Sequence, residues 1–282
     1  MSTSHRWRPS DAHMSARTVE VTYWSAVGNG GSVMQQVLLD DHGQSAIKYT
    51  EGTMWGERWA YRTQAVGPRA VEAVMQRMHG WYLSGPEAFC DELITRGAKL
   101  VRRAHILTHF LDGLEHSAAD LPAHFRYVPC DRAPEDLLSA WLAAFGPGHP
   151  DHVPQNADTI LRHEIAPLLN GTLMGPVLPC SVLAVNERDE VVAGVVVNDW
   201  DGTPWISNGF RDPARSPRGL GTKLLLHTLH LAASDGFSAL TGSVSDDNHA
   251  SRHMCARLGF HTVSTYMTVS LGCDDSAVGR IG

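Results

Sequence analysis

The stretch "GFRDPARSPRGLGTKLLLHTLHLAA", residues 209–233, decides how the sequence is interpreted. A polar loop with two prolines runs into Gly219 and Gly221 and then directly into an apolar helical run. The first turn of a helix leaves backbone N–H groups without acceptors, and the helix dipole makes that end positive. Glycines let a phosphate approach this backbone closely, and Arg215 and Arg218 would add charge. The stretch predicts an anion site, with an ordinary loop before a helix as the alternative.

Size, charge and cysteine content narrow the class of protein. A chain of 282 residues holds one large domain or two of medium size. The formal net charge of −7 disfavours nonspecific binding to nucleic acid or to an anionic membrane. The five cysteines are scattered and form no CxxC pair, which argues against a disulfide framework or a structural zinc site. The N-terminus has no apolar h-region, and the longest apolar run, at 191–197, is too short to cross a bilayer. We expect a cytoplasmic protein with no metal and no nucleic-acid or membrane partner.

The second half of the chain predicts alternating strands and helices. A strand at 125–130 precedes a helix at 133–145 and a second helix at 159–169. Two apolar runs around the turn "ERDE" predict a hairpin, and a strand at 203–212 leads into the glycine loop. A helix at 222–233, a strand, a helix that starts after Asn248 and a final strand follow. This order is typical of an α/β fold with a mixed sheet.

The first half predicts shorter elements. Residues 1–17 predict a disordered lead, and "TVEVTYW", "SAIKYT" and "RWAYRTQAV" predict strands. Residues 69–79 predict a helix, and the polar stretch at 112–124 is typical of a linker.

One segment of the first half resembles a segment of the second. Residues 93–111 and 256–271 both predict the end of a helix, a glycine and a long strand. Gly97 would correspond to Gly259, and Val101 to Val263. The match predicts an internal repeat, with chance similarity as the alternative.

Three phosphate-binding loops compete for the glycine stretch. A nucleotide-binding P-loop requires a glycine five residues before Gly221, and the chain has none there. A dinucleotide fingerprint requires a third glycine where the chain has Leu224, and Asp235 comes too early to hold a ribose. The third loop fits. "RDPARSPRGLGTKLL" resembles the "VxPxxRGxGxG" loop of the GNAT superfamily of N-acyltransferases, and "DDNHASRHMCARLGF" resembles that family's later motif, an asparagine that starts a helix ending in "LGF".

The resemblance covers residues 126–272 and implies the GNAT fold. That fold is α/β, with a mixed, mostly antiparallel central sheet flanked by helices. Together with the internal repeat, it implies a duplicated, tandem GNAT protein whose first half has lost its cofactor site. The expected segments are a disordered lead at 1–17, a degenerate GNAT-like domain at 18–120, a catalytic GNAT domain at 121–273 and a tail at 274–282.

In this family the glycine loop holds the pyrophosphate of coenzyme A. The resemblance therefore implies acetyl-CoA or another acyl-CoA as the donor, or an acyl-phosphopantetheine on a carrier protein. The backbone of 218–222 would bind the pyrophosphate, and the strand edge at 208–212 would pair with the pantetheine arm. The backbone N–H of Phe210 or Arg211 would stabilise the oxyanion. The residues expected at the cofactor are Phe210, Arg211, Asp212, Arg215, Ser216, Arg218, Gly219, Leu220, Gly221, Thr222 and Asn248.

Two positions depart from the family's pattern. Ser216 stands where the loop usually has arginine or glutamine, which implies contact with the pyrophosphate through a shifted loop. Cys255 stands four residues before the glycine of "LGF", where many members carry a tyrosine acid. This second departure puts the usual protonation of the leaving thiolate in doubt.

The implied reaction transfers an acyl group, acetyl by default, to the amine of a small molecule by direct attack. Because an amine must lose a proton before attack, Asp199, His163 and Glu164 are candidate bases, with a water chain as an alternative. Cys255 and Tyr266 are candidate acids for the leaving thiolate. The loop at 146–158 and the segment at 81–86 are expected to line the acceptor pocket.

The sequence is also compatible with two other functions. The protein could take its acyl group from a carrier protein, or it could be a non-catalytic acyl-CoA-binding module. The first half is expected to cover the acceptor side of the cleft and to bind no second CoA. Its counterpart of the loop, "RTQAVGP", has one glycine and a proline where a pyrophosphate needs several free N–H groups.

Overall fold

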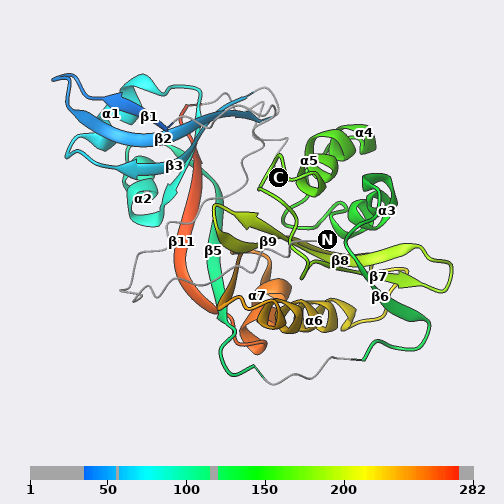
Figure 1. Ribbon diagram of the computed structural model, residues 1–282. Coiled ribbons are helices and arrows are strands. Elements are labelled where there is room, and N and C mark those ends of the chain that lie inside the picture. The colour runs from blue at the N-terminus through cyan, green and yellow to red at the C-terminus, as the bar shows by residue number, and fades with distance from the viewer. Residues whose placement is uncertain (1–34, 55–56, 115–119, 273–282) are drawn as a thin grey trace, which may run out of the picture.

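A single mixed sheet joins the two halves of the chain (Figure 1). The computed structural model describes residues 35–54, 57–114 and 120–272, so the predicted lead at 1–17, the strand candidate "TVEVTYW" and the tail at 274–282 lie outside the described residues. The sheet has 11 strands in the order β1-β2-β3-β4-β11-β5-β10-β9-β8-β7-β6, of which the pairs β3–β4 and β9–β10 are parallel and the others antiparallel. This confirms the predicted α/β fold with a mixed, mostly antiparallel sheet flanked by helices.

The strands are β1 (Gln35–Leu39), β2 (Ser45–Met54), β3 (Glu57–Ala65), β4 (Tyr82–Pro86), β5 (Lys99–Phe110), β6 (Phe125–Pro129), β7 (Val182–Asn186), β8 (Val191–Trp200), β9 (Thr203–Arg211), β10 (Ala239–Ser245) and β11 (His261–Ser270). The helices are α1 (Ala70–Arg77), α2 (Glu87–Thr95), α3 (Pro134–Ala144), α4 (Ala157–Ile160), the π-helical turn η1 (Leu161–Ile165), α5 (Ala166–Leu169), α6 (Leu220–Ser234) and α7 (His249–Arg257).

The predicted helices form close to their predicted bounds. Helix α6 starts two residues before the predicted 222, because Gly219 takes a left-handed conformation (φ 87°) and serves as its N-cap. Its buried leucines recur at helical spacing and pack on the sheet. The helix predicted at 159–169 begins at Ala157 and contains the π-helical turn, which hydrophobic periodicity does not indicate.

The two halves repeat one arrangement of strands and helices. Outward from the central pair, the order β11-β4-β3-β2-β1 on one side matches β5-β10-β9-β8-β7 on the other. Helices α2 and α7 each have 9 residues, and each leads through a glycine at positive φ, Gly97 or Gly259, into the long strand β5 or β11. The predicted correspondence of Gly97 with Gly259 holds, and the large sheet is consistent with a duplicated fold.

The halves also exchange their last strands. Strand β5 belongs to the first half in sequence but pairs with β10, from Ala104 opposite Ser245 to Phe110 opposite Ala239. Strand β11 belongs to the second half and pairs with β4 of the first. β5 and β11 pair with each other along most of their length. Neither half therefore has a complete sheet of its own.

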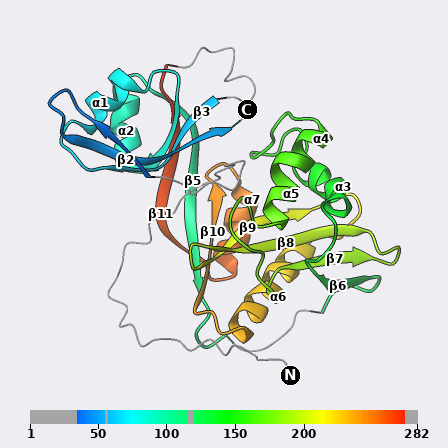
Figure 2. The ribbon, with the colours of Figure 1, turned by 45° about the horizontal axis from the view of Figure 1, so that its top comes forward.

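Helices cover the two faces of the sheet unequally. Helices α1, α2, α6 and α7 pack on one face, called here the α6 face. Helices α3 to α5 pack on the opposite face, called here the α3 face, over the strands of the second half. Figure 2 shows α3 to α5 and α6 on opposite sides of β8. Several aromatic side chains are buried on the α3 face, among them Trp141, Trp205, Phe210 and Tyr266.

Arg62 connects the first half to the hairpin formed by β8 and β9. It lies at an irregularity in the β2–β3 ladder with φ 52°, a conformation that costs a non-glycine residue energy. Its guanidinium donates to Asp201 at 2.7 Å and lies 5.0 Å from the centre of the Trp200 ring. The first half thus touches the second at this hairpin as well as through the exchanged strands.

Removal of residues 1–111 should leave the second half unable to fold as a soluble domain. The truncation removes β5, so β10 and β11 each lose a hydrogen-bonded neighbour and expose unpaired backbone and apolar surface. Soluble yield and thermal unfolding followed by circular dichroism measure the effect.

Co-expression of residues 1–111 and 112–282 as separate chains is the matched control. Because both strands are then present, soluble material that unfolds cooperatively should return. A soluble fragment 112–282 that unfolds cooperatively on its own would contradict the dependence on β5.

Candidate functional site

Strand β9 leaves β10 after a short parallel contact. Trp205 pairs with Thr241 and Ile206 with Gly242, and β9 then continues to Arg211 beside β8. The β8–β9 ladder is irregular at Ser207, where β9 turns away from β10. In a strand that has lost one neighbour, alternate backbone N–H and C=O groups face the gap. An extended, amide-containing ligand can pair with this edge, which overlaps the edge predicted at 208–212.

The start of α6 presents backbone donors that no described residue uses. Among the described residues, the N–H groups of Arg218, Gly219, Gly221 and Thr222 have no acceptor. A Cβ built on Gly219 or Gly221 would meet no atom within 4 Å, so both glycines face open space. The Arg218 side chain is exposed, with no ion-pair partner in the part of the chain that the structure describes. This arrangement fits an anion.

Asp212 holds the loop that leads to this helix. Its carboxylate accepts from the backbone N–H groups of Ala214 at 2.8 Å and Arg215 at 3.1 Å, and from Nε of Arg215 at 2.5 Å. Burial alone would raise the pKa of Asp212, but these hydrogen bonds and the charge of Arg215 hold it below its ordinary value. Arg211 in turn donates to the carbonyl and hydroxyl oxygens of Ser216 at 3.1 and 3.2 Å. The side chains of these loop residues, expected at the cofactor, therefore shape the loop itself.

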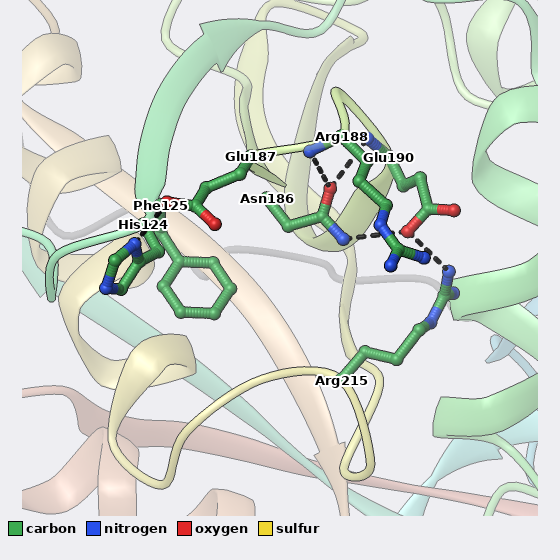
Figure 3. A pocket seen from close by; sticks show the side chains of 7 residues that line it. All are labelled: His124, Phe125, Asn186, Glu187, Arg188, Glu190 and Arg215. Atoms are coloured by element: carbon green, nitrogen blue, oxygen red, sulfur yellow. Dashed lines mark hydrogen bonds and ion pairs between the residues drawn. The ribbon is translucent and has the colours of Figure 1, made fainter.

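A hollow of about 290 Å³ lies beside the loop, next to the turn between β7 and β8 (Figure 3). Arg215 reaches toward it, 3.9 Å from Glu190, and also donates to Ser139 at 2.9 Å. With Arg215 engaged in this way, Arg218 is the loop arginine whose charge is available to a phosphate. The residues that line the hollow are His124, Phe125, Asn186, Glu187, Arg188, Glu190 and Arg215.

Three further residues expected at the cofactor use their side chains for contacts within the protein. The Phe210 ring is buried on the α3 face, 5.4 Å from the ring of Trp141, and Leu220, the first residue of α6, is fully buried against the sheet. Asn248 caps α7, where its Oδ1 accepts from the N–H of Ser251 at 3.1 Å. At Phe210 and Leu220 only the backbone can meet a ligand.

The corresponding loop of the first half has no comparable anion site. The N–H groups of Val66 and Gly67 both donate to the carbonyl of Ala46, at 2.9 and 3.1 Å. A Cβ at Gly67 would lie 2.4 Å from the carbonyl oxygen of Ser45, so no ligand has room there. Arg69 is paired with Asp40 at 3.1 Å. These contacts support the prediction that the first half binds no second CoA.

Glu164 is the candidate base that lies on the α3 face of the sheet. It belongs to the π-helical turn η1, a type of irregularity that often occurs at functional sites. Burial raises the pKa of its carboxyl to about 7, and a hydrogen bond from Trp141 offsets this only in part. The Trp141 ring packs on Phe210 of β9, so Glu164 lies on the α3 face and reaches the strand that leaves β10 through Trp141.

Asp151 is a second carboxylate on the α3 face, in a different environment. Arg102 of β5 donates to its Oδ1 at 2.6 Å, Ser245 of β10 donates to the same oxygen, and Asn248 lies 3.5 Å from Oδ2. Burial acts to raise its pKa, but the charge of Arg102 and the hydrogen bond from Ser245 hold the pKa below its ordinary value. Asp151 thus stays ionised and fixes the loop at 146–158, expected at the acceptor pocket, against β5 and β10.

The other two candidate bases lie elsewhere. Asp199 is at the turn between β8 and β9, where its Oδ1 accepts from the N–H of Gly202 at 2.8 Å. His163 is exposed on η1. The structure therefore favours Glu164 over both. The segment at 81–86, expected near the acceptor, forms the inner strand β4, and its residues Tyr82 and Leu83 are fully buried.

The two candidate acids lie on opposite faces of the sheet. Cys255 is buried on the α6 face, and burial raises the pKa of its thiol to about 11. Tyr266 lies on the α3 face of β11. It pairs with Ala104 of β5, which pairs with Ser245 of β10, so the three residues form one row that ends at the gap.

Sequence reasoning missed the residues that this geometry brings together on the α3 face. Asp151 stood in a proline- and histidine-rich loop, and Arg102 in a strand of the other half, so no local pattern linked them. Asn208 was seen only as part of a strand edge. Of the residues on this face, Glu164 and Tyr266 were predicted as a candidate base and a candidate acid.

Among the described residues no three His, Cys, Asp or Glu side chains gather as a metal would require. No helix in the described ranges has the length and apolar character needed to cross a bilayer.

The comparisons agree with this geometry. The family model for the acetyltransferase (GNAT) family matches residues 140–260, which include the separated strand, the glycine loop and α7. Residues 140–260 form a GNAT-family domain. No curated protein matches the sequence significantly.

Solved GNAT structures share the fold across both halves. A GCN5-related N-acetyltransferase from Sphaerobacter thermophilus has a TM-score of 0.57 and 15% identity, and the match covers 84% of this chain and 82% of that one. A tandem GNAT protein from the clavulanic acid biosynthesis pathway has a TM-score of 0.56 and 13% identity, with 82% and 80% covered. A GCN5-related N-acetyltransferase from Kribbella flavida has a TM-score of 0.54 and 15% identity, with 84% and 89% covered. At these identities the likeness establishes the fold alone.

Replacement of Asp212 by alanine should lower the free energy of unfolding by about 1–3 kcal/mol at pH 7, because two backbone N–H groups and Arg215 lose a buried acceptor. The depressed pKa gives the sign of the pH effect. The contribution of Asp212 is present above pH 4, near its unfolded pKa, and disappears as the pH falls through the lower folded pKa. Denaturant unfolding at pH 7 and at stepwise lower pH measures both effects.

Asp212→Asn is the matched control, since the amide oxygen can still accept from the two backbone groups. It should retain most of the stability at pH 7 and lose the pH dependence that Asp212 causes. Equal stability of the wild type and Asp212→Ala would show that the loop does not depend on this carboxylate.

Proposed function

We propose that the protein is an N-acyltransferase that moves an acyl group, acetyl by default, from a CoA thioester to the amine of a small molecule. The observation that carries the proposal is the alignment of the gap between β9 and β10 with the unpaired N–H groups at the start of α6. A backbone edge followed by an anion site suits a ligand that has amides along an arm and a pyrophosphate at its end. The GNAT-family domain at 140–260 supports the same donor.

The residues present fit such a donor. The N–H groups of 218–222 and the Arg218 side chain would hold the pyrophosphate. The edge of β9 at 207–211 would hold the pantetheine arm and present a backbone N–H to the thioester carbonyl oxygen. The donor supplies an acyl group activated by its bond to sulfur.

Glu164 is the proposed general base. With a pKa of about 7, a substantial fraction of its carboxyl is ionised at neutral pH, yet it still holds a proton well enough to take one from the amine. Asp151, held ionised by Arg102, is a weaker base with its oxygens already engaged. Two carboxyls whose environments separate their pKa values point to one catalytic and one structural role.

The proposed reaction uses one base and one acid. The amine nitrogen forms a bond to the carbonyl carbon and the carbon–sulfur bond breaks. One amine proton goes to Glu164. Tyr266 gives a proton to the sulfur and then regains a proton from solvent. Tyr266 suits this role because its row ends at the gap, whereas a Cys255 thiol of pKa about 11 is a weaker acid than an ordinary thiol.

Replacement of Gly221 by tryptophan should abolish saturable binding of acetyl-CoA and of CoA, because the indole would fill the open space that the pyrophosphate needs. Isothermal calorimetry on the folded variant measures the loss. Gly221→Ala is the matched control. Its methyl group meets no atom within 4 Å, so binding should persist, and the helix should gain up to about 1 kcal/mol of stability. Undiminished binding by Gly221→Trp would remove the proposed donor site.

Glu164→Gln should lower kcat by about 10²–10⁴-fold, the usual contribution of a general base. In the wild type, kcat at saturating substrates should rise with pH and level off above about 7, because the ionised carboxylate is the active form. The variant should lose this inflection. Thiol release from acetyl-CoA over a panel of amines, followed across pH, measures both.

Asp199→Asn and Cys255→Ser are the controls in that assay. Both residues lie away from the proposed chemistry, so both variants should keep their rate and the inflection near pH 7. A Glu164→Gln enzyme with an unchanged pH profile would exclude Glu164 as the base. Failure of every amine to release thiol would favour a non-catalytic acyl-CoA-binding module.

A donor tethered to an acyl carrier protein is the second candidate. The engagement of Arg215 by Asp212, Ser139 and Glu190 favours it, since one free arginine suits the single phosphate of a phosphopantetheine. Full rate with free acetyl-CoA in the same assay would remove the reason for this candidate.

A further inference from the structure

Asn208 has a buried polar atom with no partner, directly at the point where β9 leaves β10. The residue follows Ser207, the irregular position of the strand, and is 7% exposed. Its Oδ1 is buried and accepts no hydrogen bond from any described residue. A buried amide oxygen without a donor is costly, and native proteins rarely keep one unless a ligand or water completes it.

The side chain of Asn208 lies on the α3 face. Across the β8–β9 ladder it stands opposite Val196, which is buried in the cluster under α3 to α5. Phe210, two residues further along β9, belongs to the same cluster and packs on Trp141. Glu164 accepts a hydrogen bond from that tryptophan, so its carboxyl and the Asn208 amide lie on the same side of the sheet.

The two polar groups differ in what they can do. The Asn208 amide oxygen accepts a hydrogen bond but cannot take the proton, whereas the Glu164 carboxylate can do both. An attacking primary amine directs its lone pair at the carbonyl carbon and has two N–H bonds left. One suits Glu164, and the second needs another acceptor.

We propose that Asn208 is the residue that binds this second N–H, and that it thereby selects primary over N-methylated amines. The inference rests on the proposed acyl transfer. A secondary amine has one N–H for Glu164 and none for Asn208, so it leaves the buried oxygen unpaired. Sites built to hydrogen-bond a substrate group reject analogues that lack it by large factors.

The test compares each primary amine that the wild type acetylates with its N-methyl derivative. In the wild type, kcat/KM should favour the primary amine on the order of 10³-fold or more, given the factors typical of such sites. In Asn208→Leu, which is similar in volume but has no acceptor, this preference should fall to about tenfold or less, because both amines then lose the contact equally. Asn208→Asp, which keeps an acceptor oxygen, should retain the preference. Asp199→Asn is the control and should behave as the wild type, since its carboxylate accepts from the N–H of Gly202 at the turn between β8 and β9.

Two binding measurements separate this role from a structural one. Acetyl-CoA affinity by calorimetry should be the same in Asn208→Leu and the wild type. The thermal unfolding midpoint of Asn208→Leu should be no lower, because leucine removes a buried oxygen that has no donor. Calorimetric titration of the primary amine into the CoA complex should show weaker binding in Asn208→Leu than in Asn208→Asp.

The outcomes are distinct. An unchanged preference in Asn208→Leu would show that the methyl group is excluded by shape, and would overturn the role of Asn208 while leaving the acyl transfer intact. Loss of acetyl-CoA affinity in Asn208→Leu would also overturn it, since the amide would then serve the donor. If the wild type acetylates no amine of the panel, the proposed function itself fails.

Discussion

The exchange of β5 and β11 is the constraint on which the rest of the structure depends. β10 has β9 as a neighbour only at Trp205 and Ile206, so its remaining pairing comes from β5. Without β5, β10 would have almost no paired neighbour at the end where β9 departs, and nothing would hold that side of the gap in place. The full ladder from Ala104 to Phe110 holds β10 in place while β9 is free to diverge. A first half without an anion site of its own is thus retained as part of the second half's sheet.

The same exchange determines which side chains meet at the gap. Because β5 lies beside β10, Arg102 reaches Asp151 and Ser245, and Ala104 brings Tyr266 into line with Ser245. All these contacts join residues from different halves of the chain. The α3 face of the gap is therefore built from both halves, whereas the anion site at the start of α6 is built from one short segment.

This difference explains how much the sequence could predict. The anion site depends on local features, a glycine at positive φ and free N–H groups in the first helical turn, and a loop motif reports such features directly. Periodicity likewise gave most helices and strands. The roles of Arg211, Asp212 and Arg215 were predicted less well, because a charged side chain in a glycine loop can bind the ligand or brace the loop. The sequence does not distinguish these, and here the hydrogen bonds favour bracing. Glu164 and Asp199 also differ in burial. Burial results from tertiary packing, and no local sequence pattern indicates it.

Cys255 occupies the helix position at which the family resemblance implies a tyrosine acid. A thiol on the α6 face with a pKa of about 11 is a poor proton donor to a leaving thiolate. The acid of the proposed reaction would therefore have to be another residue. Strand β11 offers one, since Tyr266 projects on the α3 face and only Ala104 separates its position from Ser245. The row Tyr266, Ala104 and Ser245 exists because β5 is inserted between β11 and β10. In the proposed mechanism, strand exchange provides the position of the acid, and the helix position holds a small residue that packs against the sheet.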